Sequence, residues 1–205
     1  MRNFWKLAIF GMVLMQGAAQ RVGFAQTAGE KAPSVEEKKT EDKALELPWT
    51  LEEIKKDMKV GQKTQYKLTV RTVGSSGSFG LEHNYHYNFE ITEVNEKGYK
   101  LTTTLGDGKE DGESSTKECT WESIGKGYKF TESDTKVSEG KCKVAAGEFD
   151  CKIYTQTTKA DGTKNVSVYY FIMEKPGKFA RIEVNLTDSD GKSAGSQIWE
   201  LVKIE

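Results

Sequence analysis

The chain has few of the residues that would point to a familiar chemistry. It contains only two histidines, three cysteines and three prolines among its 205 residues. No H-E-x-x-H zinc helix occurs, and nothing points to a cofactor. The many Asp and Glu residues are scattered, so no pair is singled out for hydrolysis. These features favour a protein that is not an enzyme, and a carboxylate-dependent hydrolase is the alternative from another class.

The chain also lacks an excess of charge of either sign. Its 30 basic and 31 acidic side chains give a formal net charge of −1. Cleavage after Ala25 would remove Arg2, Lys6 and Arg21 but no acid, leaving 27 basic and 31 acidic side chains and a net charge of −4. Without a basic patch, neither a nucleic acid nor an anionic membrane surface is expected as a partner.

Long hydrophobic runs are absent except at the start of the chain. Leu7–Met15 is an uncharged apolar run that follows basic residues and precedes small residues ending at Ala19 or Ala25. This order is typical of a signal peptide, and the run is short for a membrane span. We therefore predict that residues 1–25 are a signal peptide, that the protein is secreted or periplasmic, and that no membrane span remains after cleavage. A membrane anchor is the alternative.

The region after the apolar run divides into a polar segment and a domain. Residues 26–47 are nearly all polar or small and could not bury enough apolar surface to offset their ordering entropy. We expect a disordered linker there, followed by a single domain over residues 48–205.

One helix is predicted at the start of this domain. Thr50 and Glu53 have the spacing of a capping box, and Gly61 supplies a stop. The expected helix is Leu51–Val60. Its apolar face consists of Leu51, Ile54 and Met58.

After Gly61 the period changes to alternation of apolar and polar residues, which is typical of strands with one dry face. Short turns containing Gly, Asn or Pro separate the segments. The expected fold is mostly β: an antiparallel meander forming a half-barrel, barrel or sandwich, with the helix packed on it. The expected strands are 65–71, 85–92, 99–105, 118–124, 127–130, 141–145, 148–156, 165–173, 179–186 and 196–204.

The two histidines are the only imidazole candidates for a metal site. His83 and His86 lie three residues apart, but the Tyr85–Phe89 alternation indicates a strand, on which odd and even positions point to opposite faces. No clustered Cys/His set completes a site, so we expect these histidines to bind no metal.

The cysteines lie near a predicted hairpin. With Ala146 and Gly147 as a two-residue turn, Cys142 and Cys151 would face each other on a non-hydrogen-bonded pair, within disulfide range. In an oxidising compartment this predicts a Cys142–Cys151 disulfide with Cys119 free. Pairing Cys119 with either partner is the alternative.

Three short motifs carry a resemblance. They are the helix-to-strand entry from Val60-Gly61 to Tyr66, the hairpin Ala146-Gly147-Glu148-Phe149-Asp150-Cys151, and the turn Glu174-Lys175-Pro176-Gly177 before a strand. In these motifs the chain resembles a group of uncharacterised exported bacterial β domains with a small-Gly-x-Phe-x-Cys hairpin. The group is similar in shape to half-barrel carriers of lipids and lipoproteins in the bacterial envelope. The resemblance implies ligand binding and no catalytic residue.

The sequence supports three functions in order. The first is a non-enzymatic exported envelope protein, a binding or assembly module of unknown ligand, whose partner would be an apolar ligand or an envelope protein. The second is a periplasmic carrier of a lipid or other apolar ligand in a half-barrel cavity lined by aromatic residues. The third is the hydrolase. A cavity of several hundred Å³ under the helix would favour the carrier.

Overall fold

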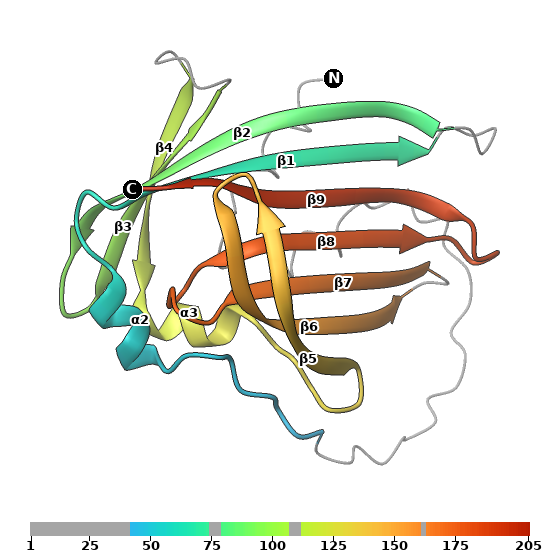
Figure 1. Cartoon of the computed structure of the whole chain (residues 1–205), viewed down its shortest axis with the longest axis horizontal. Helices are drawn as coiled ribbons and strands as arrows, with labels where there is room; N and C mark the ends of the chain where they lie inside the picture. Colours follow the sequence, from blue (N-terminus) through green and yellow to red (C-terminus); the bar gives the residue numbers. More distant parts are fainter. Residues whose placement is uncertain (1–41, 74–78, 107–111, 161–162) are drawn as a thin grey trace, which may run out of the picture.

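A computed structural model describes residues 42–73, 79–106, 112–160 and 163–205. It forms one antiparallel sheet of nine strands in the order β4-β3-β2-β1-β9-β8-β7-β6-β5, which curves round without closing (Figure 1). This confirms the predicted mostly β, antiparallel fold. The strands are β1 (Lys63–Val73), β2 (Phe79–Val94), β3 (Gly98–Leu105), β4 (Glu113–Thr120), β5 (Thr135–Val144), β6 (Gly147–Ala160), β7 (Thr163–Ile172), β8 (Phe179–Thr187) and β9 (Ser193–Ile204).

The alternating apolar residues form the inner face of the sheet. Tyr66 on β1 pairs with Tyr87 on β2 and with Leu201 on β9, and Trp199 pairs with Ile182 on β8. All five side chains are buried. Burial of such large side chains contributes most of the favourable free energy of folding.

The connection between β4 and β5 joins the two edges of the open sheet. It contains helix α3 (Trp121–Gly127) followed by Tyr128 and Phe130. The Phe130 ring stacks on Tyr154 with centroids 4.7 Å apart, and the Tyr128 ring meets Phe171 edge-on at 5.1 Å. These aromatic side chains therefore fill one end of the half-barrel, which we call the base. The opposite end, which we call the rim, carries the β8–β9 turn, the end of β1, the start of β2, the end of β6 and the start of β7 (Figure 1).

Helix α3 was not predicted, and the predicted strands 118–124 and 127–130 are wrong. Strand β4 ends at Thr120, whose hydroxyl accepts a hydrogen bond from the backbone N–H of Ser123 at 3.3 Å and so caps the helix. Cys119 and Trp121 are both buried, so their spacing of two residues resembles the alternation of a strand that continues past the β4–α3 boundary. A seven-residue helix is also too short to show a clear period of 3.6 residues.

Helix α2 (Leu51–Asp57) has the predicted capping box, with Thr50 and Glu53 each satisfying the backbone N–H of the other. It ends three residues before the predicted Val60, because Met58 already has extended backbone angles. Ile54 is buried and Met58 packs partly against the core, as expected. Leu51, which was expected to be on the buried face as well, is 37% exposed.

The segment before α2 belongs to the fold. The backbone N–H of Leu45 donates to the Phe130 carbonyl at 2.8 Å, and the Tyr154 hydroxyl donates to the Glu46 carbonyl at 2.6 Å. Leu45 and Leu47 pack against the core. Within the segment expected to be a linker, Leu45 and Leu47 thus contact the apolar surface of the domain. The remainder of the expected linker and the expected signal peptide lie outside the described residues.

The β5–β6 hairpin turns at residues 145–146, one position before the predicted turn. Gly147, with φ of 138°, starts β6 instead of completing the turn. Cys151 lies opposite Gly140, and Cys142 is two positions farther along β5, so the predicted register is wrong. Because the difference is two positions, alternation still keeps both sulfurs on the same face.

Candidate ligand pocket

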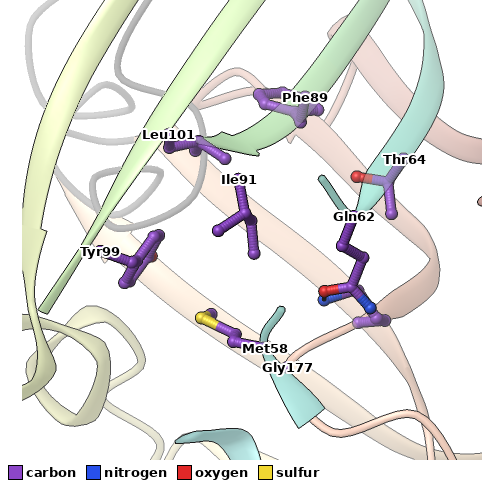
Figure 2. Close-up of a pocket in the computed structure, with 9 residues that line it drawn as sticks. Met58, Gln62, Thr64, Phe89, Ile91, Tyr99, Leu101 and Gly177 are labelled. Atoms are coloured by element: carbon purple, nitrogen blue, oxygen red, sulfur yellow. Dashed lines mark hydrogen bonds between the residues drawn. The ribbon is translucent and has the colours of Figure 1, made fainter. Parts of the chain in front are cut away.

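A small pocket lies at the base, between α2 and the sheet (Figure 2). The segment between α2 and β1, strands β1, β2 and β3, and the β7–β8 turn contribute to it. The lining residues are Met58, Gln62, Thr64, Phe89, Ile91, Tyr99, Leu101, Gly177 and Lys178.

Lys178 is the unusual member of this set. The residue is only 4% exposed, and its Nζ donates a hydrogen bond to Gln62 Oε1 at 3.3 Å. No carboxylate among the described residues lies within 4.0 Å of this Nζ. Burial lowers the pKa of Lys178, and the more distant Asp57 carboxylate partly opposes that effect. A buried ammonium with a single amide partner is costly.

The β7–β8 turn places Lys178 in the pocket. The Lys175 N–H donates to the Ile172 carbonyl at 3.3 Å, and the Lys178 N–H donates back to the Lys175 carbonyl at 3.0 Å. Gly177 between them has φ of 77°, which favours glycine. A Cβ at Gly177 would lie 3.4 Å from Ile54 Cγ2, so the turn packs closely under α2.

Helix α2 brings a second incompletely satisfied group nearby. Asp57 Oδ2 is buried and has no hydrogen-bond partner within the described part of the chain. Asp57 attracts Lys178 electrostatically without forming a direct ion pair. The helix and the turn therefore carry complementary charges that do not reach each other.

The rest of the pocket wall is apolar. Figure 2 shows Tyr99 and Leu101 on one side, Gln62 and Thr64 on the other, and Ile91 between them. Burial and the neighbouring Cys119 raise the pKa of Tyr99, so its hydroxyl stays protonated.

The space in the pocket is small. The enclosed hollow is about 20 Å³, room for one water molecule. The empty volume reaches about 350 Å³ only when the space open to solvent is included. This is far from the cavity of several hundred Å³ that would favour a lipid carrier, and the base of the half-barrel is filled by side chains instead.

The cysteines lie elsewhere, and all three are free thiols in the structure. Cys142 and Cys151 are both buried within the main hydrophobic core cluster, close to each other and to Arg181. A hydrogen bond from Cys151 lowers the pKa of the Cys142 thiol, with help from Arg181 and against burial. The same hydrogen bond and burial raise the pKa of Cys151. Cys119 belongs to a separate cluster with Tyr99 and Trp121. The Cys142–Cys151 disulfide stays a prediction.

The structure also separates the two histidines. His83 pairs with Val70 and His86 with Lys67, at positions of β2 that face opposite sides. In the described ranges, no group of three or more His, Cys, Asp or Glu side chains is arranged to hold a metal ion.

One sequence motif was not recognised before the structure was known. Gly191-Lys192-Ser193-Ala194-Gly195 has the G-x-S-x-G spacing of a nucleophile elbow. The elbow requires a strand-to-helix turn, whereas these residues run from the β8–β9 turn into β9, where Ser193 pairs with Thr187. The match is therefore one of spacing only. Lys178 was missed as well, because nothing in the sequence distinguishes it from the other lysines.

No family model matches the chain, and no curated protein matches it. One similar solved structure is that of a candidate exported protein with a YmcC-like fold from Bacteroides fragilis NCTC 9343. The two are 8% identical, the match covers 72% of this chain and 96% of that chain, and the TM-score is 0.36. A likeness at this level carries no argument about function. No helix within the described residues is long and apolar enough to cross a membrane.

Proposed function

We propose that this protein is an exported, non-enzymatic binding module, and that it holds a small ligand in the pocket beneath α2. The observation that carries the proposal is the burial of Lys178 among apolar side chains with one neutral hydrogen-bond partner. Export rests on the predicted signal peptide.

The free energy of the buried ammonium supports a binding role. An ammonium removed from water is destabilising unless an anion or several acceptors replace the lost solvation. Gln62 supplies one acceptor at 3.3 Å, and Asp57 is not in contact. A ligand that completes this environment would bind the folded state selectively and stabilise it.

The titrating carboxyl groups support the non-enzymatic part of the proposal. Among the described residues, every carboxyl group whose pKa departs from its ordinary value has a lowered pKa, in most cases because hydrogen bonds favour the ionised form. These groups are Asp42, Glu53, Glu82, Glu93, Asp134 and Glu205. A general acid for glycoside or similar hydrolysis needs the opposite direction. The filled base also gives no support to the carrier of a whole lipid.

Native mass spectrometry of protein isolated from the envelope of its source organism tests the binding role. The wild-type protein is expected to retain a small molecule. Leu101→Phe, which narrows the pocket, is expected to lose it, whereas Leu105→Phe on the same strand outside the pocket is expected to retain it. Wild-type protein that shows only the polypeptide mass would refute the binding role.

N-terminal sequencing of the same material tests export. The mature chain is expected to begin at Gln20 or Gln26, after one of the two small-residue cleavage sites. A chain that begins at Met1 would contradict export while leaving the pocket untouched.

A further inference from the structure

We propose that the ligand of this pocket is a small organic carboxylate, with its carboxylate held by Lys178, Gln62 and Thr64 and its apolar part against β2 and β3. The inference rests on the proposed binding function and names the ligand class.

The polar side chains that line the pocket can donate more hydrogen bonds than they make. Gln62 Oε1 accepts from Lys178 Nζ, which leaves the Gln62 Nε2 group free to donate. Thr64 as a whole is 7% exposed, and its hydroxyl, which is not one of the fully buried unpaired atoms of the described residues, is left to solvent or a ligand. The ammonium of Lys178, the amide of Gln62 and the hydroxyl of Thr64 all line this pocket. A hydrogen-bond acceptor would therefore complement it, and the ammonium favours a negatively charged acceptor.

The charges around Lys178 leave room for one negative group. Asp57 on α2 and Lys175 in the β7–β8 turn are the charged residues that influence Lys178, with opposite signs. Asp57 does not line the pocket. A single carboxylate would neutralise Lys178 directly, whereas a doubly charged group would exceed the charge available.

The apolar walls determine the rest of the ligand. Phe89, Ile91 and Leu101 offer aromatic and aliphatic surface, and Met58 closes the side toward α2. Met58 is unbranched and only partly buried, so it can move aside at low cost. The enclosed hollow of about 20 Å³ holds no more than a group the size of a water molecule, so the hydrocarbon part of the acid must lie in the part of the pocket that is open to solvent or displace Met58. This space suits a short aliphatic or aromatic acid and not a two-chain lipid.

Methionine methyl NMR reports directly on this pocket. Beyond Met15 the chain has two methionines, Met58 in the pocket and Met173, which is 39% exposed outside it. Octanoate, below its aggregation threshold, is expected to shift the Met58 methyl signal in a saturable manner and to leave Met173 unchanged. Octanol, which has the same chain without the charge, is expected to bind at least about tenfold more weakly, because charge-assisted hydrogen bonds are lost.

Three variants separate the pocket from general electrostatics. Lys178→Met should weaken octanoate at least about tenfold and leave octanol unchanged, and the near-isosteric apolar side chain should let the protein fold. Thr64→Val should weaken octanoate by a smaller factor. Lys175→Met removes the same charge from the same turn but not from the pocket, so it should change the octanoate affinity far less than Lys178→Met does and leave the octanol affinity unchanged.

The outcomes are distinct. Equal affinity for octanoate and octanol, or equal losses in Lys178→Met and Lys175→Met, would show that no carboxylate site exists. If neither compound shifts Met58 but native mass spectrometry finds a bound molecule, the ligand class is wrong and the binding function stands. If the native protein also carries nothing, both proposals fail.

Discussion

The base and the rim of the half-barrel share one inner face but differ in what covers it. At the base Tyr66, Phe130 and Phe171 are at most 1% exposed. Toward the rim the same face carries Leu81, which is 71% exposed, and His83, which is also exposed. The strands are continuous between the two ends, so the sheet alone does not explain the difference.

The covering elements explain it. The β4–β5 connection and α2 both lie at the base, and the cation–π contact of Lys55 with the Trp121 ring, at 5.9 Å, joins α2 to α3. The alternating pattern of a strand marks which face is apolar but not which part of it is covered. Stability should therefore be concentrated at the base.

The largest expected effect comes from Phe130, which fills the base. Phe130→Ala should lower the free energy of unfolding by about 3–5 kcal/mol, because it leaves a cavity among buried rings. Leu81→Ala at the rim should change it by less than about 0.5 kcal/mol. Urea unfolding of both variants measures the contrast, and similar losses would contradict the division into base and rim.

The second prediction concerns the two cysteines at the base end of the β5–β6 hairpin. Oxidation should join Cys142 to Cys151, leave Cys119 free, and stabilise the fold by on the order of 2–3 kcal/mol. The observed diagonal arrangement demands a small hairpin adjustment, which favours the lower value.

Non-reducing peptide mapping checks the pairing, and melting curves with and without reductant check the gain. A bridged peptide that contains Cys119, or three free thiols in protein from an oxidising compartment, would refute the pairing.

The hairpin illustrates how far sequence patterns reach. Alternation placed both cysteines on one face, and this is correct. The turn was assigned to Ala146 and Gly147 because glycine is common in two-residue turns, whereas Gly147 uses its positive φ just after the turn. Nothing local in the sequence distinguishes these two uses.

A third and smaller effect is expected at the start of α2. Thr50→Ala should cost about 1 kcal/mol, because the hydroxyl no longer accepts from the Glu53 N–H or donates to the Glu53 carboxylate, whereas the bond from the Thr50 backbone N–H remains. Thr72→Ala at the rim, where the hydroxyl makes only a 3.4 Å contact with the Leu81 carbonyl, is the matched control. Thermal unfolding measures both, and equal shifts would mean that the cap is unimportant.

The smallest expected effect is a change in pH dependence. Because the pKa of Lys178 is lowered from 10.5, the folded state binds fewer protons than the unfolded state between that lowered value and 10.5. Stability should therefore rise with pH across this window, and the rise should be absent in Lys178→Met. Burial raises the pKa values of Tyr66 and Tyr128 in the folded state, whereas these tyrosines ionise near the upper end of this window once the chain unfolds, which lowers stability as the pH rises. This contribution is present in both proteins, so the difference between the two urea series is the measurement. Identical slopes would count against a charged, buried Lys178.

The pocket itself lay beyond what the sequence could predict. Helix α2 could be predicted from the cap spacing and helical period of Thr50, Glu53 and Ile54, because these signals are local in the sequence. The position of Lys178 depends on the β7–β8 turn packing beneath α2, which brings together residues more than a hundred positions apart. Neither composition nor periodicity carries that information.

The strand order has a consequence for how the chain acquires its structure. Strands β1–β4 and β5–β9 are each consecutive neighbours and can pair locally, but β1 pairs with β9 at the centre of the sheet. Lys63 and Glu205 exchange backbone hydrogen bonds of 3.0 and 2.8 Å across that pairing. Closing so long a loop is entropically costly and slow. Two local meanders can therefore form early during synthesis, but they cannot join until β9 is available. One half of the pocket lies on β1–β3 and the other at the β7–β8 turn. These two halves therefore meet only at the end of folding.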